Sequence, residues 1–327
     1  MTRILANDGI VESAKQRLMN NGFDVITDKI PQEDLINHIS QFEALLVRSA
    51  TTVTSDIIDA GTNLKVIGRA GVGVDNIAVD YAESKNIKVV NTPGASSVSV
   101  AELVIAHLFS ASRFLNNSNK LMPESGNVDF KELKKKYSKG VELKGKTLGV
   151  IGFGRIGQEV TKLAIGIGMD ILAYNKYSYV AEIIFEFPNH ITNAVLKIPV
   201  KGVSNEEVIK NSDFITIHTP FNKGEQPIIS KKEIDMMKDG VGIINCARGG
   251  AVNEKDLLEA LNSGKVAFAG LDVFEDEPTP NQELLAHPNV SISPHIGGST
   301  IDCQERIGNE LADKVIQYFN ELTPVES

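Results

Sequence analysis

The feature that most constrains the fold of this chain is a glycine-rich segment, GFGRIG (152–157), which follows an apolar run and opens a helical pattern. Gly152, Gly154 and Gly157 have the spacing G-x-G-x-x-G. The first glycine permits a tight turn, the second lets a pyrophosphate approach the backbone, and the third lets the helix pack on the strand. The free N–H groups at the helix N-terminus favour phosphate. The segment therefore predicts a strand–turn–helix unit that binds a dinucleotide.

Strand-like and helix-like runs alternate along the rest of the chain. Short apolar or β-branched runs occur at 3–8, 24–28, 44–49, 65–70, 88–93, 147–152, 170–175, 213–220, 241–247, 266–274 and 289–295. Helical patterns at 11–22, 31–40 and 54–61 lie between the first of these runs. The alternation predicts an α/β fold with two doubly wound parallel sheets and right-handed crossovers.

Two helical segments indicate how the chain is divided. With 327 residues the chain is long enough for two domains, each with its own core. The segment 98–115 is apolar over most of its circumference, which predicts a helix buried between domains or against a second subunit. The last helix, at 299–319, would crowd the second sheet and is expected to return to the first. We therefore expect a discontinuous, flavodoxin-like domain, 1–97 with 296–327, and an inserted Rossmann-type nucleotide domain, 98–295.

Composition narrows the choice of partners. A net charge of −9 argues against a nucleic-acid-binding surface, so local arginines would have to hold a small anionic substrate. No stretch approaches the roughly 18 apolar residues of a membrane span, and the N-terminus has no signal-peptide pattern. The two cysteines do not form a disulfide framework, and Cys246 is expected to be a small buried residue. We predict a cytoplasmic protein without nucleic-acid or membrane partners.

Three segments near the end of the chain carry residues suited to hydride chemistry. NCARGG (245–250), DVFEDEP (272–278) and SPHIGGST (293–300) each follow a strand-like run. The first carries Arg248, and an arginine can hold a carboxylate in bidentate fashion and polarise a neighbouring carbonyl. The last carries His295, and a histidine can exchange a proton with a hydroxyl or carbonyl oxygen near neutral pH.

The middle segment supplies the carboxylate that would support the histidine. An adjacent carboxylate fixes the tautomer of an imidazole and favours the imidazolium. Glu277 is the candidate, but Glu275 and Asp276 lie close by, and spacing alone leaves all three open.

Two further arginines occur in the first part of the chain. Arg48 and Arg69 lie at the ends of two strand-like runs. Arg69 leads into Gly71, Val72 and Gly73, whose backbone N–H groups can surround an anion. Because ligands gather beyond the carboxyl ends of parallel strands, this group predicts the site of an anionic substrate.

The choice of cofactor depends on the residue that ends the run 170–175. A loop selective for NAD usually has Asp or Glu about 20 residues further on, bonded to the ribose. Here Asn175 occupies that position and Lys176 follows it. Asparagine can bond a ribose hydroxyl but lacks the charge that repels a 2′-phosphate. NAD is the favoured cofactor, with NADP as the alternative.

The remaining features receive ordinary structural interpretations. The polar segment 116–140 is expected to be a solvated loop with a short helix. His107 is expected to lie within a helix, and His218 to line the cofactor without acting as a catalyst. No cluster has metal-ligand spacing, so no metal is predicted. The segment 177–203 is longer than a usual connection and is expected to hold an extra helix or a hairpin.

Taken together, these segments resemble those of the D-isomer-specific 2-hydroxyacid dehydrogenases. The matching segments are LLVRSAT (45–51), VIGRAGVGVDNI (66–77), NTPG (91–94), SVAEL (99–103), GKTLGVIGFGRIG (145–157), HTP (218–220), INCARGG (244–250), GLDVFEDEP (270–278) and SPHIGGST (293–300). They occur in order over almost the whole chain. The match is closest to the branch of the family that acts on D-3-phosphoglycerate.

The resemblance implies a substrate domain made from both chain ends and roles for individual residues. Arg248 would orient and polarise the substrate, His295 would be the acid–base group, and Glu277, the acid directly before the proline, would be its partner. Arg48 and Arg69 would hold the substrate phosphate and carboxylate. The residues implied at the cofactor, besides the three glycines, are Arg155, Ile156, Asn175, Thr219, Cys246, Ala247, Arg248, Asp272, His295, Gly297 and Gly298.

The reaction implied is the oxidation of D-3-phosphoglycerate to 3-phosphohydroxypyruvate, the first step of phosphorylated serine biosynthesis, by a homodimer joined through its nucleotide domains. The alternatives are a hydroxypyruvate or glyoxylate reductase and a corepressor of the same fold that senses dinucleotides. The chain departs from the family pattern at Asn175 and at Ser96, where many relatives have Asn. It ends soon after the last helix, so no regulatory domain and no serine feedback are expected.

Overall fold

The computed structural model describes residues 1–176, 180–186, 195–222 and 224–322. The chain divides into two compact units. The first unit consists of Met1–Ser97 and Gly298–Ser327, and the second of Val98–Gly297.

The first unit contains a five-stranded parallel sheet with the strand order β2-β1-β3-β4-β5. The strands are β1 (Arg3–Ala6), β2 (Asp24–Ile26), β3 (Ala44–Val47), β4 (Val66–Arg69) and β5 (Lys88–Asn91). This is the flavodoxin-like order, which confirms the fold class predicted for this part of the chain. β3 is buried along its whole length, because helices cover both faces of the sheet.

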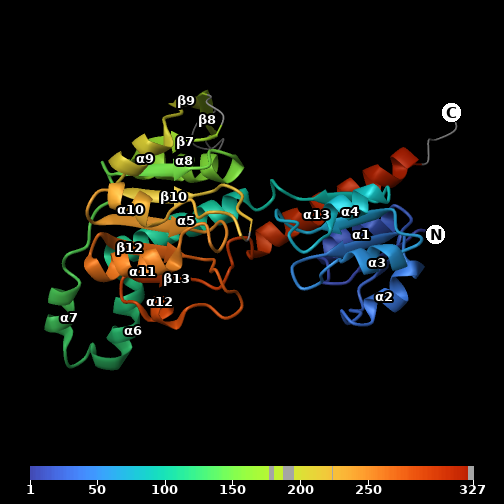
Figure 1. The fold of residues 1–327 in the computed structure, drawn as a ribbon, viewed down its shortest axis with the longest axis horizontal. Coiled ribbons are helices and arrows are strands. Elements are labelled where there is room, and N and C mark those ends of the chain that lie inside the picture. Colours follow the sequence, from blue (N-terminus) through green and yellow to red (C-terminus); the bar gives the residue numbers. More distant parts are fainter. Residues whose placement is uncertain (177–179, 187–194, 223, 323–327) are drawn as a thin grey trace. The chain divides into compact units, whose positions relative to one another are not determined.

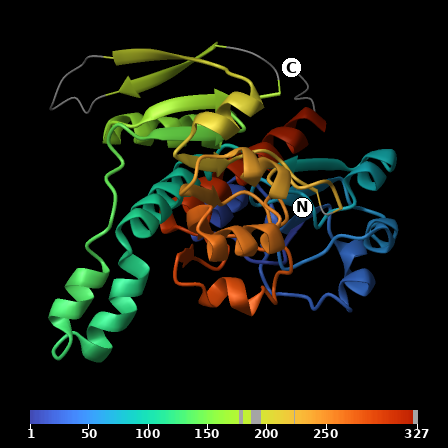
Figure 2. The same cartoon turned by 60° about the vertical axis from the view of Figure 1, so that its left-hand side comes forward.

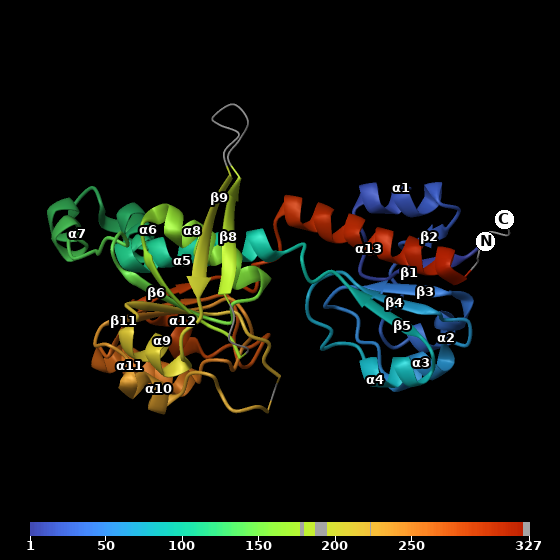
Figure 3. The ribbon, with the colours of Figure 1, turned by 90° about the horizontal axis from the view of Figure 1, so that it is seen from above.

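Helices from opposite ends of the sequence cover one face of this sheet. α1 (Glu12–Asn20) and α13 (Ile301–Leu322) lie side by side on it (Figure 3). Leu311 and Val315 of α13 are fully buried and share a core with Leu18 of α1. The opposite face carries α2 (Leu35–His38), the 3₁₀ helix η1 (Ile39–Gln41), α3 (Ser55–Ala60) and α4 (Val79–Ser84). The apolar stripe of the last helix thus completes the core of the first unit.

The second unit contains a six-stranded parallel sheet with the order β13-β12-β11-β10-β6-β7. The strands are β6 (Thr147–Ile151), β7 (Asp170–Tyr174), β10 (Phe214–Ile217), β11 (Val241–Asn245), β12 (Val266–Leu271) and β13 (Val290–Ile292). The predicted second doubly wound sheet is confirmed. One row of paired residues crosses the whole sheet: Ile292, Leu271, Asn245, Ile217, Ile151 and Tyr174. Each strand ends at this row, so all six carboxyl ends lie at one edge.

Helices cover both faces of the second sheet (Figure 1). One face carries α5 (Ser97–Arg113) and α8 (Arg155–Ile167). The other carries α9 (Asn205–Asn211), α10 (Lys231–Met236), α11 (Glu254–Ser263) and α12 (Gln282–Ala286). Side chains at the N-termini explain where these four helices begin, since each accepts or exchanges hydrogen bonds with the first turn. These capping residues are Ser204, Ser230 with Glu233, Asn253 and Asn281.

The segment 177–203, for which the sequence predicted an extra helix or a hairpin, contains a hairpin in its described part. β8 (Val180–Glu186) and β9 (Val195–Lys201) pair in antiparallel fashion and project from the second unit (Figure 3). Ile183 and Val200 are buried and join the core beneath α8. Ile184, the next residue along β8, is 42% exposed. The hairpin thus packs against the core of the second unit through one apolar face. Residues 177–179 and 187–194 of this segment lie outside the described part of the chain.

A pair of short helices stands away from the second sheet (Figure 2). α6 (Leu115–Ser125) and α7 (Phe130–Lys136) replace the loop and single helix expected from the sequence. Apolar side chains are exposed on and between them, with Val128 80% and Phe130 57% exposed. In the described residues no single helix has the length and apolar composition to cross a membrane; α5 and α6, which meet at a bend of 58°, meet those criteria only when taken together.

The docking of the hairpin can be tested with two adjacent residues. Ile183→Ala should lower the free energy of unfolding by about 2–4 kcal/mol, because it leaves a cavity in the core beneath α8. Ile184→Ala removes the same atoms from the exposed face and should cost less than about 1 kcal/mol. Chemical denaturation of both variants measures the difference. Equal losses would show that the hairpin does not pack in this register.

Candidate active site

The candidate site lies at the carboxyl edge of the second sheet, because the register brings the predicted residues together there. Gly152 follows β6, Asn175 follows β7 and His218 follows β10 directly. Cys246 follows β11 and Asp272 follows β12 in the same way. Backbone hydrogen bonds extend the ladder by one residue, with Gly152 N bonded to Tyr174 O at 2.9 Å and Asp272 N to Asn245 O at 3.0 Å. Residues far apart in the sequence therefore leave the sheet at one level.

The glycine loop has the geometry that its spacing predicts. Gly152 has φ +97°, and a Cβ there would lie 2.6 Å from the carbonyl carbon of His218. A Cβ on Gly157 would lie 2.3 Å from Gly152 O, so α8 can pack on β6 only without a side chain at this position. A Cβ on Gly154 would meet nothing within 4 Å. The second glycine thus faces open space at the N-terminus of α8, which is where a pyrophosphate would lie.

The neighbouring strand end supplies polar groups beside this loop. β6 and β10 are adjacent in the sheet although β7 lies between them in the sequence, so the topology reverses direction here. Dinucleotides bind at such a switch point. Thr219 Oγ1 and His218 Nδ1 are buried without a hydrogen-bond partner in the described part of the chain. Burial lowers the pKa of His218 to about 3, so this imidazole is neutral. A buried hydroxyl without a partner, beside an open glycine loop, fits a polar cofactor.

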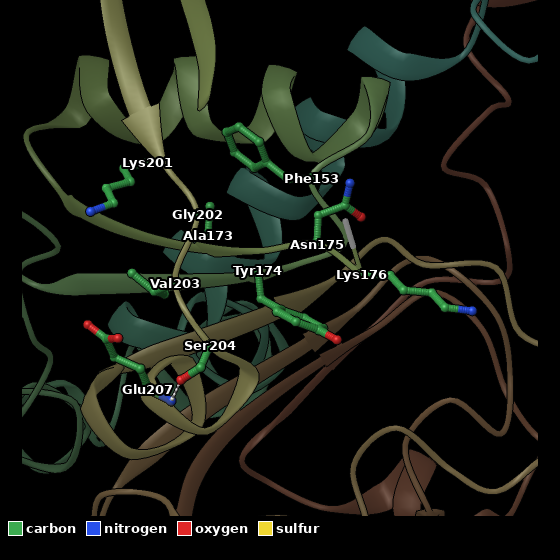
Figure 4. A pocket seen from close by; sticks show the side chains of 10 residues that line it. All are labelled: Phe153, Ala173, Tyr174, Asn175, Lys176, Lys201, Gly202, Val203, Ser204 and Glu207. Atoms are coloured by element: carbon green, nitrogen blue, oxygen red, sulfur yellow. Dashed lines mark hydrogen bonds between the residues drawn. The ribbon is translucent and has the colours of Figure 1, made fainter. Parts of the chain in front are cut away.

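A cavity of about 540 Å³ lies beyond the end of β7 (Figure 4). Phe153 of the glycine loop borders it, together with Asn175 and Lys176 after β7. Lys201 of β9 and Glu207 of α9 line it from the other side. In a dinucleotide-binding unit the ribose-binding residue follows the strand that corresponds to β7, and Asn175 occupies that position beside the cavity. The sequence did not reveal Lys201 and Glu207, because one lies at the end of the hairpin and the other on the helix that follows it.

His295 and Glu277 form a hydrogen-bonded pair at this edge. His295 Nδ1 lies 2.8 Å from Glu277 Oε2, and both side chains are partly exposed. The second carboxylate oxygen of Glu277 accepts the Phe274 N–H at 3.0 Å, which orients the group. Glu275 turns elsewhere, since it accepts the N–H of Glu254 at the start of α11 at 3.0 Å. The structure therefore selects Glu277 among the three acids left open by spacing.

His295 lies in a strained loop that Asp272 holds. His295 has φ +55°, in the left-handed region that residues other than glycine seldom adopt. Its N–H donates to Asp272 O at 2.7 Å. The buried Asp272 carboxylate accepts the N–H groups of Ile296 and Gly297, each at 2.8 Å. Asp272 was predicted to lie at the cofactor, but its carboxylate forms hydrogen bonds with the backbone of the chain itself.

Arg248 lies in a turn that hydrogen bonds fix from both sides. The Asn245 side chain accepts from Ala247 N at 3.0 Å and donates to Arg248 O at 2.9 Å. A Cβ on Gly249 would lie 1.8 Å from Phe274 O, so the turn needs glycine to pass the neighbouring loop. Burial raises the pKa of the Cys246 thiol well above its usual value, helped by the charge of Asp272. Cys246 is buried and stays protonated, as a structural residue would.

Arg48 and Arg69 of the first unit lie at the carboxyl edge of the five-stranded sheet. Arg69 pairs in register with Val47 of β3, and Arg48 follows Val47 directly. Asp8 holds the Arg48 loop by accepting its backbone N–H at 2.7 Å. A Cβ on Gly71, which has φ +139°, would overlap the Arg69 guanidinium, so this glycine makes room for the side chain. The two arginines thus lie at the ends of two adjacent strands.

The structure also reveals residues that the sequence analysis missed. His107 was interpreted as an ordinary helical residue, and it does lie within α5, but its ring joins a buried polar network around Asp272. Its partners, Ser291 and Ser293, lie on and just after β13. Only tertiary contact identifies such a network, since the residues lie more than 180 positions apart. Among the described residues no group of three or more metal-ligating side chains occurs.

Two parallel, doubly wound sheets, a glycine loop at a switch point and a histidine–carboxylate pair define the class of dinucleotide-dependent dehydrogenases. Residues 105–297 match the family model described as the D-isomer specific 2-hydroxyacid dehydrogenase, NAD binding domain. The chain belongs to the D-isomer specific 2-hydroxyacid dehydrogenase family. It is an oxidoreductase, and its second unit is the NAD-binding domain.

Known relatives share the family but differ in activity. A hydroxypyruvate reductase of Thermotoga maritima is 43% identical over 98% of this chain and 98% of its own length. A D-3-phosphoglycerate dehydrogenase of Methanocaldococcus jannaschii is 41% identical over 96% of this chain, which spans only 57% of that protein. The crystal structure of a glyoxylate reductase from Paecilomyes thermophila superposes with a TM-score of 0.80 at 28% identity, covering 99% of this chain and 96% of that one.

The glycine loop yields a test of cofactor binding. Gly152→Ala should abolish measurable NADH binding by fluorescence, because the new Cβ would collide with the His218 backbone and displace the loop. Gly240→Ala is a matched control in the same unit, since Gly240 has φ +80° and no atom within 4 Å of its Cβ position. Both variants should lose about 1 kcal/mol or more of stability from backbone strain. Equal NADH affinities in the two variants would contradict the assignment of the loop.

Proposed function

We propose that His295, Glu277 and Arg248 are the catalytic residues of a D-2-hydroxyacid dehydrogenase. The observation that carries the proposal is the 2.8 Å pair between His295 Nδ1 and Glu277 Oε2 at the edge that also bears the glycine loop. Because Nδ1 is engaged by the carboxylate, Nε2 is the ring nitrogen left for the substrate oxygen. The pair then has the geometry of a general base oriented by an acid.

The chemistry follows from the charges of these groups. In the oxidative direction the neutral His295 takes the hydroxyl proton of the substrate at Nε2. Glu277 stabilises the imidazolium that forms, and returns the ring to the same orientation after each turnover. Arg248 holds the substrate carboxylate and polarises the growing carbonyl through its guanidinium. A bound NAD would accept the hydride, which carries both electrons of the oxidation.

The proposed cofactor site follows the edge of the second sheet. Gly152 and Gly154, with Arg155 and Ile156 at the start of α8, would hold the pyrophosphate. Asn175 would bond the adenosine ribose beside the cavity at the end of β7. Thr219, Cys246 and Ala247 would line the path from there to His295. Because Asn175 and Lys176 carry no negative charge, the site should tolerate a 2′-phosphate better than one with a carboxylate there.

D-3-phosphoglycerate is the substrate that we propose, which would place the protein at the first step of phosphorylated serine biosynthesis. This substrate has a phosphate and a carboxylate, and the edge of the first sheet presents Arg48 and Arg69 from adjacent strands. The M. jannaschii D-3-phosphoglycerate dehydrogenase, at 41% identity, supports this choice. Gly71, Val72 and Gly73 would add backbone N–H groups to the anion site.

Hydroxypyruvate reduction is the second candidate. The T. maritima hydroxypyruvate reductase matches 98% of this chain and 98% of its own length at 43% identity, which favours it. The same catalytic residues would serve both reactions, because each acts on a 2-hydroxy or 2-oxo acid. Only the group at the far end of the substrate differs.

We also propose a homodimer formed through the second unit. Exposed apolar side chains on α6, on α7 and between them support this proposal; they include Met122, Val128 and Phe130. Large apolar patches on a soluble protein mark interaction surfaces. Sedimentation of the purified protein measures the association directly, and a monomer would refute it.

Substitutions of His295 and of two neighbouring acids, Glu277 and Asp276, test the acid–base proposal. Glu277→Gln should lower kcat by about 10²-fold, because the imidazolium loses its counter-charge, and His295→Ala should lower it by about 10²–10⁴-fold. NADH binding should stay nearly unchanged in both. Asp276→Asn is the control, since it removes the adjacent charge without touching the His295–Glu277 pair. An active His295→Ala enzyme would refute the proposed role.

The substrate is tested by steady-state assays with 3-phosphoglycerate, glycerate and hydroxypyruvate, each with NAD or NADP (reduced for the reverse reaction). We expect 3-phosphoglycerate with NAD to have the highest kcat/KM. Arg48→Ala and Arg69→Ala should raise KM for the phosphorylated substrate at least about tenfold, since each removes a charged anion contact. Arg17→Ala, on α1 of the same unit, is the control. If the preference for the phosphorylated acid is absent, the hydroxypyruvate candidate replaces it. If the preference survives both variants, the assignment of Arg48 and Arg69 to the anion site is wrong.

A further inference from the structure

A buried network of polar side chains links α5 to the loop that carries His295. His107 of α5 is 4% exposed, and its Nε2 lies 2.9 Å from Ser293 Oγ. Ser293 Oγ in turn donates to Asp272 Oδ1 at 2.6 Å. On the other side of the ring, His107 Nδ1 lies 2.9 Å from Ser291 Oγ, which lies 3.1 Å from Ser110 Oγ.

The fold makes space for this imidazole. Gly270 lies within β12, where glycine normally weakens a strand. A Cβ at Gly270 would lie 2.7 Å from the Cβ of His107 and 2.7 Å from Cδ1 of Ile244. The strand therefore carries glycine where the histidine lies against it. Leu148 and Val150 belong to the apolar core on this face of the sheet, where a polar ring without partners would be costly.

The protons of the network can be assigned from its donors. Ser293 has one hydroxyl proton, which it donates to the Asp272 carboxylate. Its oxygen can then only accept from His107, so the proton of the imidazole lies on Nε2. Burial lowers the pKa of His107, despite an opposing effect of the Asp272 charge, so the ring is neutral and Nδ1 is an acceptor. Ser291 Oγ lies 2.9 Å from this nitrogen.

The network ends at the Asp272 carboxylate, which holds the loop 293–297. Asp272 accepts the N–H groups of Ile296 and Gly297, and its backbone oxygen accepts the N–H of His295. The left-handed backbone of His295 is strained and persists only where the surroundings over-determine it. Rotation of the Asp272 carboxylate would break its bonds to Ile296 and Gly297, the two residues that follow His295.

We propose that His107 is a positioning residue for the proposed acid–base group: through Ser293 it orients the Asp272 carboxylate, which holds His295 in place against Glu277. This proposal rests on the catalytic role proposed for His295. His107 touches neither substrate nor cofactor in this scheme and acts only through the loop 293–297.

The test compares two replacements of His107 in the full-length enzyme. His107→Leu keeps an apolar side chain of similar size but removes the N–H donor to Ser293, and should lower kcat about ten- to a hundredfold. KM for NAD should change less than about twofold, because the glycine loop is not involved. His107→Gln can place an amide N–H near the position of Nε2 and should restore most of kcat. Ser293→Ala breaks the same link from the other side and should match His107→Leu.

The control is a core residue that lies one position along the same helix. Leu108→Ala should lower the Tm, because Leu108 is fully buried, while kcat stays within about twofold of the wild type. A comparable loss of kcat in Leu108→Ala would mean that general destabilisation explains the effect. A folded His107→Leu or Ser293→Ala enzyme with wild-type kcat, or a His107→Gln enzyme as slow as His107→Leu, would overturn the proposal.

Combination with His295→Ala separates this proposal from the proposed function. If His107 acts only through His295, adding His107→Leu to His295→Ala should cause no further loss of kcat. An additional tenfold loss would overturn the positioning role. If His295→Ala alone retains full activity, the proposed function itself fails. If His295→Ala is inactive while His107→Leu is fully active, only the positioning role fails.

Discussion

The common end of the strands in the second sheet is the constraint on which the rest of the site depends. Parallel pairing in one register brings six strands to a single row, from Ile292 to Tyr174. Residues separated by more than a hundred positions then emerge side by side at this edge. The glycine loop, the turn of Arg248 and the loop of His295 therefore need only local bonds to adopt their final positions. A register shift in one strand would separate them, since it would reverse the faces of its side chains.

Asp272 shows how local bonds complete the arrangement. A buried carboxylate is costly unless several donors satisfy it, and here a hydroxyl and two backbone N–H groups do so. The same bonds hold His295 at a backbone conformation that it would not adopt alone. One set of interactions therefore stabilises the charge of Asp272 and also orients the proposed acid–base group. This arrangement explains why a histidine as remote as His107 can be expected to matter for turnover.

Sequence patterns predicted much of the fold but only part of the site. The spacing of Gly152, Gly154 and Gly157 specifies a turn whose sterics are local, so it could be recognised without a structure. The helices α9 to α12 were not singled out in advance, although capping residues such as Ser230 and Asn253 marked their starts. The choice of Glu277 among three acids depended on which side chain turns toward His295, and spacing within a loop does not specify that.

By itself the sequence determined the α/β class, the dinucleotide loop, and the order in which Arg248, an acid and His295 follow successive strands. These features depend on periodicity and on the conformational preferences of glycine, which act within a few residues. Only the tertiary structure decided that the segment after β7 forms a hairpin packed through Ile183, and that His107 joins Ser293 and Asp272. The physical reason is that burial and hydrogen bonding of these side chains depend on partners distant in the chain, which no local pattern encodes.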